Sequence, residues 1–206
     1  MIQLINVSKD YQENKLLRNI NLTIERGKVY GFKGSNGSGK TMLLRAILGL
    51  IKVEGNVIIN NEHLNFGSVY PLNVGVFIEK PSIIHEFTAL KNLKQIAILK
   101  GINDSHIMTK YLKEFGLNPS DKRKVRKYSL GMKQKVGLAQ TLMGDPELIV
   151  LDEPTNALDK KSISILLDIL RRLKDKGCTI LIASHQFEHI ESIVDEIFHI
   201  EAGELI

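Results

Sequence analysis

The sequence predicts an α/β fold built around a mostly parallel sheet. Three observations predict it. Short apolar segments alternate with amphipathic helical segments along the 206 residues, a glycine-rich loop joins one apolar segment to a helix, and an apolar segment near residue 150 ends in two carboxylates. Parallel strands that are buried on both faces have such near-continuous apolar sequences, because helices cover both sides of the sheet.

The expected elements follow in chain order. The first two expected strands alternate polar and apolar residues, and we expect them to form an antiparallel N-terminal β portion. The expected strands are Ile2–Val7, Ile20–Ile24, Val29–Phe32, Gly55–Asn60, Val74–Ile78, Leu148–Leu151, Thr179–Ala183 and Ile197–Ile200. Apolar residues at helical spacing predict helices over Thr41–Leu50, within Leu90–Phe115 and over Ile163–Leu173.

One helical section interrupts the alternation of strands and helices. It predicts an inserted helical lobe over about residues 82–134, with residues 1–81 and 135–206 forming the core lobe of a single domain. A hydrophobic content of 43% is enough for a buried core. Cys178 is the only cysteine, which excludes an intrachain disulfide and favours a reducing compartment.

The bulk properties restrict the location of the chain but leave its partners open. The N-terminus lacks the features of a signal peptide, and no apolar run reaches the roughly 18–20 residues needed to cross a bilayer. We therefore expect a protein that is soluble by itself. The net charge of +5 is compatible with nucleic acid, an anionic membrane surface or a nucleotide as the partner.

Residues 34–41 form a phosphate-binding loop between an expected strand and an expected helix. They read Gly34-Ser35-Asn36-Gly37-Ser38-Gly39-Lys40-Thr41, a complete G-x-x-x-x-G-K-[ST] motif. Glycines let successive amides turn towards phosphates, and the helix N-terminus adds partial positive charge. Lys40 can bind the β- and γ-phosphates, and the Thr41 hydroxyl can ligate Mg²⁺. The loop predicts a P-loop NTPase core that binds ATP with Mg²⁺.

The apolar strand before residue 152 places two carboxylates where ligands of parallel sheets gather. Asp152 and Glu153 follow Leu148–Leu151 directly. We expect Asp152 to hold Mg²⁺ and Glu153 to orient or deprotonate the attacking water. His185 follows the next strand at the same edge and is either a structural histidine or a contact of the γ-phosphate. Asp159 is a candidate N-cap of the helix from Lys160 onward.

These motifs and one further segment resemble the ATP-binding cassette (ABC) family. Residues 128–134, Tyr128-Ser129-Leu130-Gly131-Met132-Lys133-Gln134, are similar to the family's L-S-G-G-Q signature loop. They precede DEPTNALD at residues 152–159 by the family's usual short distance, and Ser184-His185 follows the next strand. With the phosphate loop, this ordered set covers the whole chain. The signature loop distinguishes the family from other P-loop NTPases.

The resemblance implies a role for each matching residue. Tyr11 would stack on adenine, although a simple strand-edge tyrosine is the alternative. Ser129 and Gly131 would contact the γ-phosphate bound by the opposite protomer of a head-to-tail dimer. Asp159 would lie at the dimer seam, and His185 would be the switch histidine. Lys40, Glu153 and His185 would be the catalytic residues.

The sequence departs from the family pattern at two places. Leu130 and Met132 replace the usual glycine and glutamine of the signature loop, a variant that resembles antibiotic, lantibiotic and peptide exporters. Glu79 stands where the family has a glutamine that touches Mg²⁺ and the lytic water. Glu79 is therefore a nucleotide- and metal-site candidate that adds negative charge beside the γ-phosphate.

The resemblance also implies the partners and the location. We expect an ATP-hydrolysing subunit at the cytoplasmic face of the cell membrane, paired with itself or with a second cassette and bound to an integral membrane permease that works in export. The apolar residues Ile83, Ile84 and Phe87 are expected to form a docking groove. The alternative is a soluble family member that acts on nucleic acid or ribosomes, but the chain has no room for a coiled-coil insertion and no cysteine-rich module, so no nucleic acid is expected.

The basic run Lys122-Arg123-Lys124-Val125-Arg126-Lys127 precedes the signature segment. It is either a solvated face or a contact for the loops of a membrane partner, for anionic headgroups or for nucleic acid.

Overall fold

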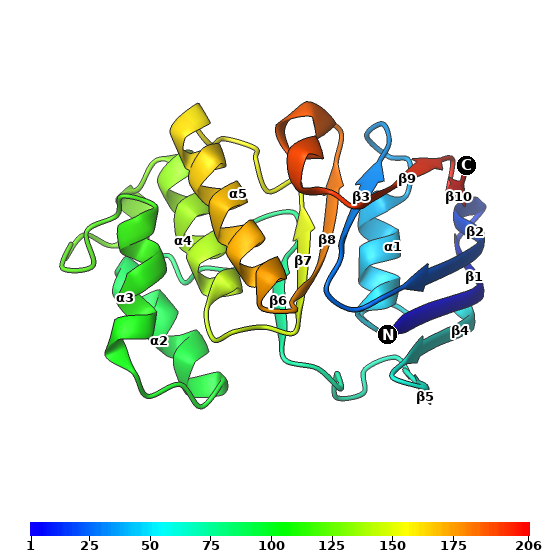
Figure 1. Cartoon of the computed structure of the whole chain (residues 1–206), viewed down its shortest axis with the longest axis horizontal. Helices are drawn as coiled ribbons and strands as arrows, with labels where there is room; N and C mark the ends of the chain where they lie inside the picture. The colour runs from blue at the N-terminus through cyan, green and yellow to red at the C-terminus, as the bar shows by residue number, and fades with distance from the viewer.

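The computed structural model describes residues 1–206, which form two β-sheets with helices packed around them (Figure 1). The larger sheet has six strands in the order β10-β9-β3-β8-β7-β6. All neighbours run parallel except β10, which pairs antiparallel with β9. The strands are β3 (Val29–Lys33), β6 (Val74–Phe77), β7 (Leu148–Asp152), β8 (Thr179–Ser184), β9 (Glu196–Glu201) and β10 (Glu204–Leu205). The predicted mostly parallel sheet is confirmed.

Strands β7 and β8 are apolar because both faces of the sheet are covered. Every residue of these two strands is buried. Successive side chains point to opposite faces, so Ile149 and Ile180 belong to one core cluster while Val150 and Leu181 belong to the other. The larger sheet therefore separates two hydrophobic cores.

The smaller sheet is the predicted antiparallel β portion. Its order is β2-β1-β4-β5, and all its pairs are antiparallel. The strands are β1 (Ile2–Tyr11), β2 (Asn14–Ile24), β4 (Glu54–Ile59) and β5 (Glu62–His63). Helix α1 (Lys40–Ile47) contributes Leu43, Leu44 and Ile47 to the core of 22 buried residues that joins this sheet to the larger one.

The remaining helices share the second core. They are α2 (Ala89–Leu99), α3 (Ser105–Glu114), α4 (Leu130–Leu142) and α5 (Lys160–Asp175), with short 3₁₀ turns at Val125–Lys127, Phe187–His189 and Glu191–Ile193. Figure 1 shows α2, α3 and α4 at the β6 edge of the larger sheet. A core of 29 buried residues runs from β7 and β8 to all four helices, so the helical region packs continuously against the sheet.

Some elements differ from the expected ones. The expected boundary at residue 134 falls inside α4, a single helix that also packs on β6, and the division into two lobes stays a prediction. The two-residue strands β5 and β10 were not predicted, because two residues carry no periodic signal. None of the helices combines the length and apolarity that crossing a bilayer demands.

Candidate nucleotide site

The phosphate loop lies between β3 and α1, as predicted. Gly39 precedes α1 with a φ of 109°, a left-handed conformation that favours glycine. Gly34 is fixed by a close approach instead, since a Cβ there would lie 2.3 Å from the carbonyl oxygen of Ile200. Because β3 lies between β8 and β9, and β7 lies beyond β8, the carboxyl ends of these strands meet beside the loop. This strand order gathers the predicted site.

Lys40 is buried under the loop that it would serve. Lys40 is only 6% exposed. Its Nζ donates hydrogen bonds to the carbonyl oxygens of Gly34 at 2.9 Å and Ser35 at 2.8 Å. The ammonium group therefore holds the loop closed on itself through its own carbonyls. Anionic phosphate oxygens are stronger hydrogen-bond acceptors than neutral carbonyls. Lys40 Nζ can therefore exchange its hydrogen bonds to the carbonyl oxygens for hydrogen bonds to a phosphate group.

Thr41 and Asp152 form a pair of oxygen donors at the start of α1. The Thr41 hydroxyl donates to Asp152 Oδ2 at 2.7 Å, and Asp152 is almost fully buried. Burial raises the pKa of the Asp152 carboxyl, the hydrogen bond from Thr41 opposes that shift, and the neighbouring Glu153 charge adds to it. Hard oxygen ligands of this kind suit Mg²⁺, which takes few protein ligands beside its waters and phosphates. The pair fits the predicted metal.

Glu153 and His185 are in direct contact. His185 Nδ1 lies 2.9 Å from Glu153 Oε2, and the His185 backbone N–H donates to Glu153 Oε1 at 3.0 Å. The Ser184 hydroxyl also donates to Oε2, at 3.2 Å. Glu153 itself has a left-handed φ of 49° and is fixed by a hydrogen bond from its N–H to the Ala183 oxygen. Three donors on adjacent residues thus orient this carboxylate.

Glu79 lies near enough to Asp152 for its charge to act on that carboxyl, and it pairs with a residue that we did not predict. Its Oε1 accepts from Arg45 NH2 at 2.6 Å, and Glu79 has a left-handed φ of 60°. The Glu79 charge also contributes to the raised pKa of Asp152. Arg45 lies four residues after Thr41 on α1, and this i,i+4 spacing was a signal that could have placed it on the site-facing side.

The open cavity beside the loop has a volume of about 410 Å³. It combines six residues of the phosphate loop and α1 with Asp152, Glu153 and two groups of residues that the sequence did not indicate. These two groups are Lys15, Leu16 and Arg18 on β2, and Ala202 and Gly203 in the β9–β10 turn. No local pattern marks either group, because the packing of the smaller sheet and of the last hairpin brings them to the loop.

The β9–β10 turn also supports the phosphate loop directly. The Gly203 N–H donates to the Ser38 oxygen at 2.9 Å, and the Gly203 oxygen accepts from the Arg18 N–H at 2.8 Å. A Cβ at Gly203 would lie 2.7 Å from the Leu16 oxygen, in backbone with a φ of 83°. A glycine is therefore required where the turn joins the loop to β2.

The residues of the signature segment gather elsewhere. Ser129 is the N-cap of α4 and accepts from the Met132 N–H at 3.3 Å. A Cβ at Gly131 would lie 2.7 Å from the Ala157 oxygen, so the first turn of α4 packs against the 152–159 segment. Leu130 is 67% exposed. Neither Ser129 nor Gly131 lines the cavity.

Asp159 and Tyr11 also lie outside the cavity lining. Asp159 is the predicted N-cap of α5, because its Oδ1 accepts from the N–H and the hydroxyl of Ser162. These hydrogen bonds lower the pKa of Asp159, and Lys135 lies 3.5 Å from its other oxygen. Tyr11 ends β1 and is 61% exposed.

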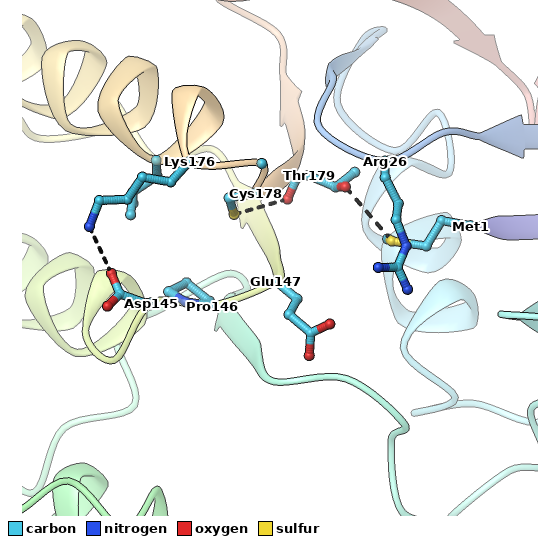
Figure 2. Close-up of a pocket in the computed structure, with 10 residues that line it drawn as sticks. Met1, Arg26, Asp145, Pro146, Glu147, Lys176, Cys178 and Thr179 are labelled. Carbon is cyan, nitrogen blue, oxygen red and sulfur yellow. Dashed lines mark hydrogen bonds and ion pairs between the residues drawn. The ribbon is translucent and has the colours of Figure 1, made fainter.

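A second cavity lies at the opposite ends of the strands. Figure 2 shows its lining near the start of β7 and β8, with Lys176 directed at Asp145. It has a volume of about 150 Å³. Cys178 belongs to it, but the thiol is buried and burial raises its pKa to about 12. No predicted site residue lies here, so this cavity takes no part in the nucleotide site.

Comparisons with known proteins agree with this geometry. The ABC transporter family matches residues 17–156. YybJ of Bacillus subtilis (strain 168), an uncharacterized ABC transporter ATP-binding protein, is 40% identical over 100% of this chain and 94% of its own length. The lantibiotic transport ATP-binding protein SrtF of Streptococcus pyogenes is 36% identical over 100% of this chain and 89% of its own length.

A solved structure shares the whole fold. The dimeric structure of a post-hydrolysis state of the ATP-binding cassette MJ0796, bound to ADP and Pi, has a TM-score of 0.89 and 28% identity, and the match covers 100% of this chain and 96% of that chain. The family match, the full-length relatives and this cassette confirm the predicted resemblance and the predicted ATPase activity. The chain belongs to the ABC transporter family, and it is an ATP-binding, ATP-hydrolysing transporter subunit.

Proposed function

We propose that this subunit hydrolyses ATP at composite sites in a head-to-tail pair of cassettes and thereby drives export through a separate membrane-spanning partner. One observation carries the proposal. The cavity of a single chain is open and contains the phosphate loop, Asp152 and Glu153, whereas Ser129 and Gly131 are turned to another part of the surface. A second cassette can therefore close the site, and the solved relative with ADP and Pi is dimeric.

In this proposal the phosphate loop binds the triphosphate and Tyr11 stacks on adenine. The amides of residues 34–41 and the N-terminus of α1 face the phosphates. Lys40 leaves the Gly34 and Ser35 carbonyls, which hold it at 2.8–2.9 Å, and binds the β- and γ-phosphates. Because the displaced carbonyls lie in the loop itself, ATP binding must also adjust the loop backbone.

Mg²⁺ would be held by Thr41 and Asp152, with Glu79 as a third oxygen donor. When bound, the ion neutralises charge that develops on the phosphate oxygens. The Thr41 hydroxyl must then turn its oxygen lone pairs away from its present role as donor to Asp152. Glu79 is paired with Arg45, so ligation by Glu79 would compete with that ion pair.

Glu153 acts as the general base for hydrolysis. Its carboxylate takes a proton from water while the water oxygen bonds to the γ-phosphorus and the bond to ADP breaks. His185 holds Glu153 through Nδ1, which leaves Nε2 of a neutral imidazole as an acceptor. Donation from Nε2 to the γ-phosphate therefore requires the protonated imidazole.

The opposite cassette supplies Ser129 and Gly131 to the γ-phosphate, and Asp159 lies at the seam. Ser129 is the N-cap of the 13-residue helix α4, whose N-terminus favours an anion. The exposed Leu130 would cover the phosphate against water. The second cassette is another copy of this chain or a related subunit, and light scattering of the purified ATP-bound protein distinguishes the two.

The direction and the partner rest on the relatives and on an apolar surface. SrtF is named for lantibiotic transport, which supports export of a peptide-like cargo. The subunit would work at the cytoplasmic face of the membrane. A groove of about 260 Å³ lies between β6 and α2 and is lined by Val76, Lys80 and Leu99. The residues expected to dock follow Lys80 in the sequence: Ile84 is 47% exposed and Phe87 is half-buried, whereas Ile83 packs on the core. We propose that this region receives the membrane subunit.

Co-expression with the adjacent membrane protein tests the docking proposal. Ile84→Ser/Phe87→Ser should weaken pull-down of that protein by several-fold or more, because each anchor commonly contributes about 1–3 kcal/mol. ATP binding should survive. The matched control is Phe66→Ser/Val69→Ser, which changes two other exposed apolar residues. Unchanged pull-down would refute the assignment, and loss of ATP binding as well would show that these residues are part of the core.

A further inference from the structure

The positive charge of the protein is concentrated in two short segments. Residues 84–94 and 121–127 together carry seven lysine or arginine side chains and two carboxylates. This surplus equals the net charge of +5 of the whole chain, so the remaining residues are neutral in sum. We name the seven cationic residues the basic surface: Lys91, Lys94, Lys122, Arg123, Lys124, Arg126 and Lys127.

Backbone contacts join the two segments into one surface. The Val125 N–H donates to the Phe87 oxygen at 2.8 Å, and the Arg126 N–H donates to the His85 oxygen at 3.0 Å. Val125 is fully buried, which anchors the basic run to the core. Asn92, buried within α2, binds both the N–H and the oxygen of Ile84. The basic surface is therefore a fixed part of the fold and not a mobile tail.

The second basic face of this region comes from α2. Lys91 and Lys94 are three residues apart and both exposed, so they share one side of the helix. Lys91 Nζ lies 3.8 Å from the centroid of the Phe87 ring. The backbone oxygen of Phe87 accepts from the Val125 N–H in the basic run. This contact connects the α2 lysines to the run at 122–127.

The two carboxylates are already occupied, and by specific partners. Asp121 accepts from the Arg123 guanidinium at 2.7 Å, which lowers the pKa of the carboxyl to about 2. Glu86 lies 2.8 Å from Lys124 and 3.6 Å from Arg126, and the hydrogen bond from Lys124 lowers its pKa. Lys91, Lys94, Lys122 and Lys127 have no carboxylate partner.

This division of charges favours a bilayer over a nucleic acid. The Arg123 fork, which could grip a single phosphate, is hydrogen-bonded to Asp121, and Arg126 lies 3.6 Å from Glu86. The four side chains of the surface without a carboxylate partner are all lysines. The one aromatic ring of the surface, that of Phe87, has Lys91 over one face, which competes with a base for stacking there. Dispersed ammonium groups suit a diffuse layer of anionic headgroups, to which each contributes independently.

We propose that the basic surface binds the anionic headgroups of the membrane, independently of nucleotide. The site of ATP hydrolysis does not include any of the seven residues. The interaction adds a direct contact with lipid to the one made through the membrane subunit. It requires no membrane-inserted segment, because the lysines act at the headgroup layer within a Debye length of about 8–10 Å.

Vesicle sedimentation of the purified full chain tests the proposal. We expect binding to phosphatidylcholine vesicles that contain about 30% phosphatidylglycerol, no binding to pure phosphatidylcholine, and loss of binding between about 0.05 and 0.5 M salt. Lys94→Ala/Lys122→Ala should lower the partition coefficient about twenty- to thirty-fold, at about fivefold per lysine. Its thermal melting and ATP turnover should match the unmodified protein.

The matched control is Lys52→Ala/Lys113→Ala, which removes two other exposed lysines without carboxylate partners and changes the net charge equally. It should retain binding. Equal binding to neutral and anionic vesicles would overturn the proposal, as would an equal loss in the control or no binding at low salt. Tighter binding of a single-stranded RNA oligomer, lost in Lys94→Ala/Lys122→Ala, would overturn it in favour of nucleic acid.

Discussion

Replacing Glu153 with glutamine should separate ATP binding from hydrolysis. Glutamine has the same shape but cannot take the proton from water. Loss of one positioned base lowers a rate by about 10²–10⁴, which corresponds to about 2.7–5.5 kcal/mol of activation free energy. The phosphate loop and Asp152 are untouched, so the affinity for ATP should remain.

The hydrogen bonds of Glu153 show why the fold should tolerate this change. The amide oxygen can still accept from the His185 N–H, now at 3.0 Å, and the amide NH₂ can donate to the Ser184 hydroxyl, which is able to accept. Only the contact with His185 Nδ1, at 2.9 Å, requires the other tautomer. About 1 kcal/mol of stability is at stake, or about 2–4 °C in Tm for a chain of this size.

The assay combines phosphate release, calorimetric ATP binding and size-exclusion chromatography with light scattering. Glu153→Gln should bind ATP, release almost no phosphate and accumulate as an ATP-bound dimer. The matched control is Ser184→Ala, which removes one hydrogen bond to Glu153 but keeps the carboxylate, and it should retain turnover. Turnover of Glu153→Gln within a few-fold of the unmodified protein would refute the assignment of the base.

Three further substitutions test the other site residues. Lys40→Ala should nearly abolish MgATP binding in a calorimetric titration, because Lys40 is the loop's only side-chain cation, and an unchanged Kd would exclude the loop as the nucleotide site. Glu79→Gln should leave the fold intact and should not lower the hydrolysis rate, since its ion pair with Arg45 is partly exposed and contributes about 1 kcal/mol at most. A strong loss of rate would make Glu79 an essential ligand. Asp152→Asn should raise the Tm of the nucleotide-free chain at neutral pH by a few degrees while removing magnesium-supported ATP binding. Because the folded pKa of Asp152 is raised, the carboxyl costs no stability at a pH below its unfolded pKa of 3.8, and the cost grows as the pH rises through the folded pKa. A Tm gain that is equal at pH 4 and pH 8 would contradict this cause.

The sequence predicted the parts of the site that are contiguous in the chain. The phosphate loop, the two carboxylates after β7 and the histidine after β8 each follow an apolar strand, and a parallel sheet brings the ends of such strands together. Lys15 and Gly203 could not be found in this way. They reach the cavity through the packing of β2 and the last hairpin, for which no local pattern exists.

The helix α4 shows why periodicity also failed in places. Residues 136–142 are all buried, so the helix has no polar face over this length and its sequence lacks the amphipathic pattern that marked α5. Arg45 illustrates a different limit. Its position on α1 was predictable, but its ion pair depends on the left-handed backbone conformation of Glu79. Nothing in the sequence indicates that conformation, because Glu79 is not a glycine.

The position of β3 in the sheet has a consequence for the synthesis of the protein. Val29 pairs with Ile180, Tyr30 pairs with Glu196, and Gly203 supports the phosphate loop from the last hairpin. A ribosome adds about 5–20 residues per second, so the loop waits about 7–30 s for the strands that seat it. During that time the apolar strand β3 lacks β8 and β9, the two strands that flank it in the sheet, and something other than those strands must keep it from aggregating. Nucleotide binding is thus among the last properties that a newly made chain acquires, and ATP can stabilise only the finished subunit.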